Sequence, residues 1–309
     1  MRLRIGTRGS ALALWQSRHV AARLSAGDRD LQVVLVEITS AGDRLTDVPL
    51  SHVEGTGFFT AAIEQALAAG EIDVAVHSFK DLPVDSTAGL IVAAVPERGP
   101  VEDVLCGRDG LTLATLPAGA RVGTCSTRRT AQVRLMRQDL EMVTLRGNVP
   151  TRVARVGRDL DAIVLARAGL VRLGLDHAIT EVFAIDRMVP APAQGALAIQ
   201  CRIGDTAVHR RIAVLDDAPT RRAVEAERTM LHVLGGGCSV PVGAIATPVA
   251  GGLSLSAAVF NAATGAALRV CVTGADPVAL GQLAAARLMA LGAGEILAAF
   301  ASSSAGAPA

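Results

Sequence analysis

Residues 60–83 read TAAIEQALAAGEIDVAVHSFKDLP, and this stretch indicates the fold class of the whole chain. Residues 60–69 carry the apolar spacing of a helix, which Gly70 ends. The following apolar run, residues 72–76, has the length and β-branched content of a strand, and polar residues come soon after it. A helix that leads into a buried strand is part of a βαβ unit, so the segment predicts an α/β fold.

The same alternation extends through most of the chain. We predict strands at residues 2–6, 31–38, 121–123, 142–145, 162–165 and 196–199, and helices at residues 11–24, 127–137, 151–156 and 169–173. Elements of these lengths predict βαβ units and largely parallel sheets. Half of the residues are apolar but only 2% are aromatic, which also favours α/β layers packed by small aliphatic side chains.

Two proline-rich stretches suggest where the chain passes between domains. Residues 96–100 read PERGP and residues 190–195 read PAPAQG. A chain that leaves one domain near residue 96 and returns near residue 195 builds two domains joined by two connections, and a long helical pattern after residue 220 predicts a third. We therefore predict one domain from residues 1–96 and 196–217, a second from residues 97–195, and a smaller third from residues 218–309.

The charge balance argues against several classes of protein. The chain has 30 basic and 29 acidic residues, so it lacks the large excess of positive charge that would indicate binding to nucleic acid or to a membrane surface. Lys80 is the only lysine, and arginine supplies the other basic side chains of this count. Arg18 and His19 interrupt the N-terminal apolar run, unlike in a signal peptide. Arg287 and Glu295 interrupt the apolar C-terminal stretch, which we interpret as packed helices.

Polar and basic side chains gather after the predicted strands. Five strand ends carry such residues: Arg8; Ser78, Lys80 and Asp81; Thr124, Ser126, Arg128 and Arg129; Arg146 and Gly147; and Arg167. The carboxyl ends of strands form the ligand crevice of open α/β sheets, and several of these ends lead into helix N-termini, which favour anions. Arginine adds bidentate recognition of carboxylate or phosphate. The sequence therefore predicts a cleft for a ligand with several anionic groups.

These side chains also have simpler interpretations. A single arginine can be a solvated cation or half of an ion pair. Arg128, Arg129, Arg146 and Arg152 together, however, would form an unmatched positive cluster unless an anion binds. Asp81 can be a structural counter-ion, a general acid or base, or a partner for a developing cation, and sequence spacing leaves these alternatives open.

Cys238 follows a run of glycines. Residues 235–239 read GGGCS; glycine permits positive φ and leaves space for a close ligand, although an ordinary flexible turn would have the same composition. The other cysteines, at positions 106, 125, 201 and 271, are scattered and form no C-x-x-C pair. This set predicts reduced thiols in a cytoplasm, with neither a disulfide framework nor a zinc site.

Six motifs, in order along the chain, resemble those of the porphobilinogen deaminase family. They are TRGS at 7–10 with LALWQ at 12–16, HSFKDLP at 77–83, GTCSTRR at 123–129, LRGN at 145–148, PAQGA at 192–196 and GGCSVPVG at 236–243. The resemblance implies three α/β domains. The first two would be similar to the lobes of two-lobed periplasmic anion-binding proteins, with mixed sheets, and the third would be a smaller α/β domain.

The resemblance also implies an activity, a transferase reaction of porphyrin and heme biosynthesis. Four porphobilinogen molecules would be condensed head to tail, with loss of ammonia, to give hydroxymethylbilane. A dipyrromethane cofactor would prime the chain from a thioether on Cys238, and Asp81 would be the catalytic carboxylate. The positions that match cofactor contacts are Ser78, Lys80, Thr124, Ser126, Arg128, Arg129, Arg146, Gly147 and Gln194, and those that match substrate contacts are Arg8, Arg152 and Arg172. A cytoplasmic monomer is implied, without metal, nucleic acid or membrane.

Some residues depart from the family pattern, and two other functions compete with it. Thr56 and Ala61 stand where lysines are common, which puts a cationic lid at residues 55–61 in doubt, and Gly235 replaces an acidic residue. A two-lobed protein that binds or senses an anionic metabolite would use the same arginines. An enzyme with a cysteine nucleophile would need a histidine base near Cys238, and His232 is the nearest candidate in sequence.

Overall fold

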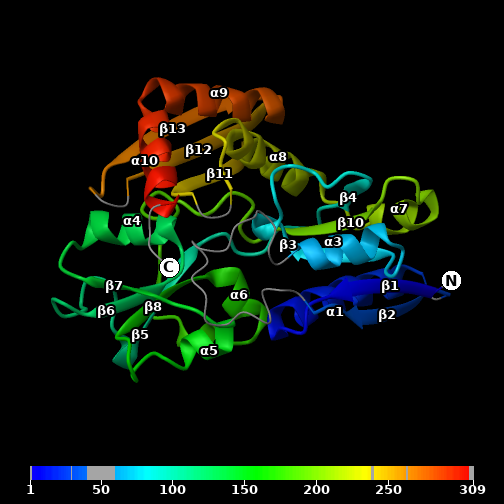
Figure 1. Ribbon diagram of the computed structural model, residues 1–309, viewed down its shortest axis with the longest axis horizontal. Helices are drawn as coiled ribbons and strands as arrows, with labels where there is room; N and C mark the ends of the chain where they lie inside the picture. Colours follow the sequence, from blue (N-terminus) through cyan, green and yellow to red (C-terminus); the bar gives the residue numbers. More distant parts are fainter. Residues whose placement is uncertain (1, 29, 40–59, 238–239, 262–263, 306–309) are drawn as a thin grey trace.

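Three β-sheets organise the computed structural model, which describes residues 2–28, 30–39, 60–237, 240–261 and 264–305 (Figure 1). The first sheet has the order β2-β1-β3-β10-β4, the second β7-β6-β8-β5-β9, and the third β11-β12-β13. The strands of the first sheet are β1 (Arg2–Thr7), β2 (Gln32–Glu37), β3 (Val74–Ser78), β4 (Leu90–Ala94) and β10 (Leu197–Arg202). Those of the second are β5 (Asp103–Gly107), β6 (Arg121–Thr124), β7 (Glu141–Thr144), β8 (Ala162–Ala166) and β9 (Glu181–Val182). Those of the third are β11 (Val242–Val249), β12 (Gly252–Phe260) and β13 (Ala267–Gly274).

Helices pack against each sheet. The first sheet is accompanied by α1 (Ala11–Gly27), α3 (Ala61–Ala68) and α7 (Thr206–Ala213), and the second by α4 (Thr127–Met136), α5 (Val149–Val153) and α6 (Arg167–Arg172). The third sheet has α8 (Ala218–Val233), α9 (Pro277–Ala290) and α10 (Ala293–Ala305), and the last two are the packed helices expected from the apolar C-terminal stretch. Short 3₁₀ turns are η2 (Phe79–Asp81), η3 (Arg108–Gly110) and η4 (Asp176–Ala178). The three-sheet α/β architecture confirms the predicted fold class.

Both five-stranded sheets are mixed, which confirms what the family resemblance implied, whereas the largely parallel sheets predicted from the alternation of strands and helices were wrong. Strand β1 pairs parallel with β2 and β3, whereas β10 runs antiparallel to both β3 and β4. In the second sheet β6 pairs parallel with β7 and β8, whereas β5 runs antiparallel to both β8 and β9. The reason is that β5 and β10 each follow one of the two connections between the sheets, and each enters its sheet in the opposite direction.

The two mixed sheets repeat one arrangement, although the sequence shows no internal repeat. In each, a glycine on the central parallel strand lets the neighbouring segment approach, because a Cβ on Gly6 or Gly123 would lie 2.2 Å from Ile72 Cδ1 or 2.7 Å from Leu160 Cδ1. Each strand then leads to a helix that a serine caps: the N–H groups of Ala13 and Arg129 donate to the Ser10 and Ser126 hydroxyls, respectively. The N-termini of α1 and α4 therefore occupy equivalent places at the carboxyl ends of the two sheets.

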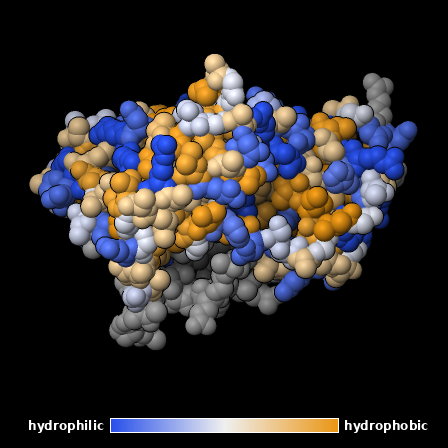
Figure 2. Space-filling model, turned by 90° about the horizontal axis from the view of Figure 1, so that it is seen from above, coloured by the Kyte–Doolittle hydropathy of each residue, from blue (hydrophilic) through white to orange (hydrophobic). Residues whose placement is uncertain are grey.

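The third sheet is covered by α8 and α9, which enclose an apolar core against it (Figure 1). Some apolar side chains of α9 remain exposed, among them Leu283 and Met289, and polar and apolar residues are interspersed over the face in Figure 2. Among the described residues, no single helix is long and apolar enough to span a membrane; α9 and α10 pass that test only as a pair, with a bend of 81° between them.

A buried glutamate on α8 joins the third sheet to both connections. The Glu227 carboxylate is fully buried and forms a bidentate pair with Arg98, with N···O distances of 2.7 and 2.9 Å. It also accepts the backbone N–H groups of Ala193 and Ala246, at 2.7 and 2.9 Å. Arg98 lies in the first connection and Ala193 in the second, so one carboxylate holds both. The predicted domain boundaries, at 96/97, 195/196 and 217/218, stay a prediction.

We expect Glu227→Gln to lower the free energy of unfolding by roughly 3–5 kcal/mol, because it leaves Arg98 buried without its counter-charge. Urea denaturation followed by circular dichroism measures this change. Glu225→Gln is the matched control, since Glu225 is an exposed residue of the same helix and should shift stability by less than about 0.5 kcal/mol. Equal denaturation midpoints for both variants would contradict this account of the carboxylate.

Candidate functional site

The segment after β3 carries the predicted catalytic pair on a short turn. Phe79 and Leu82 are buried on either side of Lys80 and Asp81, and the Phe79 N–H donates to the Ala196 carbonyl at 3.0 Å. The anchored apolar residues leave the Asp81 side chain exposed at the end of the strand. The strand runs two residues further than the sequence predicted, so Ser78 is its last residue and does not follow it.

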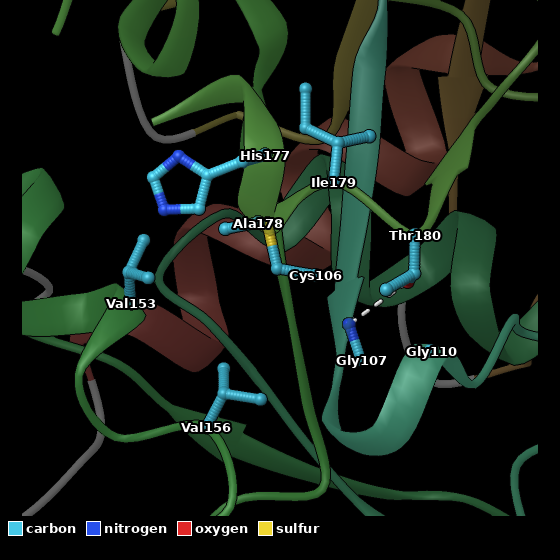
Figure 3. Close-up of a pocket in the computed structure, with 9 residues that line it drawn as sticks. All are labelled: Cys106, Gly107, Gly110, Val153, Val156, His177, Ala178, Ile179 and Thr180. Atoms are coloured by element: carbon cyan, nitrogen blue, oxygen red, sulfur yellow. Dashed lines mark hydrogen bonds between the residues drawn. The ribbon is translucent and has the colours of Figure 1, made fainter. Parts of the chain in front are cut away.

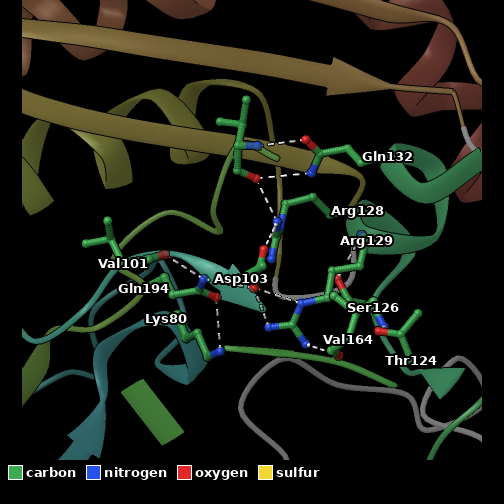
Figure 4. A network of polar contacts seen from close by, with 11 residues as sticks. Lys80, Val101, Asp103, Thr124, Ser126, Arg128, Arg129, Gln132, Val164 and Gln194 are labelled. Atoms are coloured by element: carbon green, nitrogen blue, oxygen red, sulfur yellow. Dashed lines mark hydrogen bonds and ion pairs between the residues drawn. The ribbon is translucent and has the colours of Figure 1, made fainter. Parts of the chain in front are cut away.

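A polar network extends from this turn into the second sheet (Figure 4). The Lys80 ammonium donates to Gln194 Oε1 at 3.4 Å. The Gln194 amide in turn donates to the Val101 carbonyl at 2.8 Å and to Asp103 Oδ1 at 3.0 Å. Gln194 belongs to the second connection and Asp103 begins β5, so the network crosses from the first sheet to the second.

Asp103 is the residue that sequence reasoning missed. It is fully buried and pairs with Arg128 Nη1 at 2.6 Å and with Arg129 Nη2 at 2.8 Å. Burial alone would raise the pKa of Asp103, but the charges of the two arginines and the hydrogen bonds from Arg128 and Gln194 hold it well below its usual range. The expectation that Arg128 and Arg129 belong to an unmatched cluster was therefore wrong. An aspartate at the head of the apolar run DVLC was the available signal, because a buried carboxylate requires a partner.

Arg128 and Arg129 also donate to backbone carbonyl groups. Arg128 Nη1 donates to the Val189 carbonyl at 2.6 Å, and Arg129 Nη1 donates to the Val164 carbonyl at 3.3 Å. Both side chains are buried. Both arginines therefore stabilise the second sheet at the start of β5, around Asp103.

Four other predicted residues come together at the start of α4 and α5. The Ser126 N–H donates to Thr124 Oγ1 at 3.3 Å, which shapes the turn that leads into α4. Arg152 Nε donates to the Gly147 carbonyl at 2.7 Å, and Gly147 adopts a φ of 98° that favours glycine. Arg152 Nη1 also reaches Cys125 Sγ at 3.3 Å. The loops after β6 and β7 are thus joined.

The electrostatics of these loops is positive. Burial raises the pKa of the Cys125 thiol, but the charges of Arg152 and Arg129 outweigh it and the pKa lies below its ordinary value. Among the described residues, Arg146 Nη2 is buried without a hydrogen-bond partner. A buried guanidinium N–H that lacks an acceptor fits an anionic ligand at this position.

The remaining predicted residues lie elsewhere along the edge or outside the description. Ser78 Oγ accepts from the buried Gln16 amide at 2.7 Å, and Arg8 lies half-buried between β1 and α1. Arg172 donates to the Gly195 carbonyl at 2.7 Å, and its guanidinium carbon lies 5.7 Å from the centroid of the Trp15 ring. Burial lowers the pKa of Arg172 to about 10.

Cys238 lies outside the described residues, as do Thr56 and the rest of residues 40–59. The chain is described as far as Gly237, and Gly235 adopts a φ of 66° just after α8 ends. Ala61 is the first residue of α3.

One pocket of about 490 Å³ holds none of the predicted site residues (Figure 3). Its lining is mostly apolar and includes Cys106, Val153 and His177. Burial raises the pKa of the Cys106 thiol to about 11, which keeps it protonated. This pocket therefore offers little chemistry. It differs in this from the carboxyl ends of β3, β6 and β7 with Lys80, Arg146 and Arg152, which we call the cationic sheet edge.

Comparison with known proteins gives consistent results along the chain. A protein-family model described as "Porphobilinogen deaminase, dipyromethane cofactor binding domain" matches residues 3–210. A second family model, described as "Porphobilinogen deaminase, C-terminal domain", matches residues 221–290. The porphobilinogen deaminase of Xanthomonas oryzae pv. oryzae is 46% identical over 300 residues, which cover 96% of this chain and 99% of the relative. That of Brevibacillus brevis is 43% identical over 297 residues, which cover 96% of each chain.

Solved structures also align with the chain at low identity. A periplasmic substrate-binding protein of an ABC transporter from Coxiella burnetii gives a TM-score of 0.43 at 13% identity and covers 73% of this chain and 94% of its own. A nutrient-binding protein from Burkholderia cenocepacia bound to methionine gives a TM-score of 0.44 at 13% identity, with 71% and 93% covered.

The Lys80 side chain has an unusual acidity that can be measured directly. Burial lowers the pKa of Lys80 to about 8, and the charges of Arg129 and Arg128 act in the same direction, while Asp81 and Asp103 oppose it. The ammonium form is therefore lost as the pH rises through about 8. Because the unfolded chain binds this proton more tightly, the free energy of unfolding without ligand should rise between this pH and about 10.4.

We expect one NMR signal from the chain labelled with ε-¹³C-lysine, since Lys80 is the only lysine. Its titration midpoint should lie near 8 in the folded chain without ligand and near about 10.4 in urea. An anion that binds at the sheet edge should raise the folded-state midpoint. A midpoint above about 10 in the folded chain would show that Lys80 is solvated and not part of the buried network.

Proposed function

The chain belongs to the porphobilinogen deaminase family, and from this membership we propose that it condenses four porphobilinogen molecules head to tail, with loss of ammonia, to give hydroxymethylbilane. It is thus a transferase of tetrapyrrole biosynthesis, a hydroxymethylbilane synthase. The observation that carries the proposal to this chain's own residues is the cationic sheet edge beside Asp81. Each pyrrole unit brings an acetate and a propionate, so the growing chain is a polyanion that such an edge can bind.

The described residues fit a dipyrromethane cofactor. Arg146 Nη2, which has no hydrogen-bond partner among the described residues, can bind its carboxylates together with the Lys80 ammonium and Arg152, and the N-terminus of α4 adds backbone donors. When bound, the cofactor supplies the pyrrole α-carbon to which the first substrate unit is joined. We propose that Cys238 holds it through a thioether, because this cysteine directly follows the glycine loop at the end of α8.

Asp81 is our candidate for the reaction's acid and base. Its exposed carboxylate lies at the end of β3, where it can accept pyrrole N–H groups and stabilise the positive charge that develops as ammonia leaves. The same oxygen atoms can receive or return a proton during the condensation. We assign the substrate carboxylates to Arg8, Arg152 and Arg172.

We divide the remaining cofactor contacts according to whether they belong to the buried network around Asp103. We propose that Ser78, Thr124, Ser126 and Gly147 line the cofactor, as the resemblance implies. Arg128, Arg129 and Gln194 serve the cofactor through the network around Asp103, which orients Lys80. A cytoplasmic monomer that needs no nucleic acid, membrane or metal remains our expectation from the resemblance.

The mass of the intact protein tests this function against its competitors. We expect the chain mass plus two porphobilinogen units less two ammonias, with the adduct mapped to Cys238. Cys238→Ser should carry no adduct and should be inactive. A protein that only binds an anionic metabolite would show the unmodified mass, and a transient thioester would disappear on incubation. Full activity with an unmodified Cys238 would refute the proposed attachment.

The arginines should separate into two classes when replaced. Arg146→Met should stay within about 1 kcal/mol of the parent in stability but lose cofactor loading or turnover, because its Nη2 has no hydrogen-bond partner among the described residues and we assign it to a ligand carboxylate. Arg128→Met should lose roughly 2–3 kcal/mol of stability, because Asp103 keeps Arg129 and Gln194 but loses one of its two buried arginine partners. Urea denaturation and the assay for bound pyrroles report the two effects. A large loss of stability in Arg146→Met together with parental stability in Arg128→Met would contradict this division of roles.

A further inference from the structure

Arg228 on α8 contacts the backbone on both sides of Lys80 and Asp81. These two residues belong to η2 (Phe79–Asp81), which we call the catalytic turn. Its Nη1 donates to the Phe79 carbonyl at 3.3 Å and to the Leu82 carbonyl at 3.0 Å. Its Nη2 donates to the Pro83 carbonyl at 2.5 Å. One side chain from the third domain therefore fixes the backbone that precedes and follows the pair.

The chemistry of this contact is specific to arginine. The guanidinium carbon also lies 4.5 Å from the centroid of the Phe79 ring, so the planar group stacks on the ring while its edge reaches three carbonyl oxygens. A lysine ammonium is a point charge with fewer donors in a less fixed geometry. Lysine would therefore keep the positive charge but lose part of this arrangement.

The turn needs such support because its own hydrogen bonding is slight. The 3₁₀ turn has only three residues, and the Leu82 N–H reaches the Phe79 carbonyl at 3.3 Å. Short 3₁₀ segments have poor hydrogen-bond geometry and contribute little stability alone. Carbonyl groups near buried Phe79 and Leu82 also need donors, and Arg228 supplies them.

The same helix sets the position of two other parts of the site. Glu227, the preceding residue, holds both connections through Arg98 and Ala193. Helix α8 then ends at Val233, and the chain reaches Cys238 five residues later. The helix is thus a rigid link from the catalytic turn to the start of the cysteine loop.

We propose that Arg228 is a positioning residue for the condensation: it holds Asp81 and Lys80 at a fixed place relative to the loop that carries the cofactor. The inference rests on the proposed function, because Arg228 acts only through Asp81 and never touches substrate. Its loss should let the turn shift while substrate carboxylates still bind their arginines. The rate of turnover should therefore suffer more than substrate affinity.

The test uses the holoprotein and the variants Arg228→Met and Arg228→Lys. We expect Arg228→Met to carry the normal adduct mass, to lose roughly 10–100-fold in kcat with KM changed less than about threefold, and Arg228→Lys to lie between it and the parent. In protein without cofactor, the Lys80 ¹³C signal of Arg228→Met should titrate closer to about 10.4, because the displaced turn admits water. Arg222→Met is the matched control, since exposed Arg222 lies on the same helix and donates to the Ala275 carbonyl at 2.6 Å instead.

The outcomes separate this inference from the proposed function. If Asp81→Asn loses turnover while Arg228→Met keeps parental kcat and the parental Lys80 midpoint, Arg228 is not a positioning residue. If Asp81→Asn itself turns over normally, the role proposed for Asp81 fails, and the Lys80 midpoint still reports whether Arg228 holds the turn. Should Arg228→Met fail to fold, Arg228→Lys decides: a lowered kcat with unchanged KM supports the proposal, and a parental kcat overturns it.

Discussion

A carboxylate removed from water must have its oxygen atoms satisfied by donors, and Glu227 meets this demand with groups from three separate segments. Arg98 comes from the first connection, the Ala193 N–H from the second, and the Ala246 N–H from the third sheet. Because the burial of an unpaired charge is strongly unfavourable, these segments are held together whenever the protein is folded. The placement of the first and second sheets, and of the edge between them, depends on this pair.

The candidate site contains a second buried carboxylate whose oxygen atoms are satisfied by donors from separate segments. Asp103 is also fully buried and gathers Arg128, Arg129 and Gln194 around it. Through Gln194 its influence extends to Lys80 on the first sheet. Two buried acids thus organise the polar groups between the first and second sheets. Arg128 and Arg129 are neutralised within the protein, whereas Arg146 Nη2 has no hydrogen-bond partner in the part of the chain that the structure describes.

Sequence reasoning succeeded where the relevant residues are neighbours in the chain. The placement of Lys80 and Asp81 at the end of β3 follows from an apolar run and the polar residues after it. The matching of Arg128 by Asp103 could not be predicted in this way, because the two are 25 residues apart and meet only once β5 enters the second sheet. The direction of β10 was equally hidden, since apolar spacing identifies a strand but carries no information about its orientation. Arg228 was missed because its partners are carbonyl groups about 145 residues away, which no side-chain pattern reveals.

The path of the chain through the two mixed sheets has a consequence for synthesis on the ribosome. Strand β4 has its pairing partner in β10, and the first sheet therefore waits for residues 197–202 before it can close. The second sheet is complete once Val182 has emerged. The first sheet, which contains the earliest strand of the chain, thus finishes after the second, and until then β3 has an open edge that another chain could pair with. For these two sheets, the order in which they begin along the chain is the reverse of the order in which they can be completed.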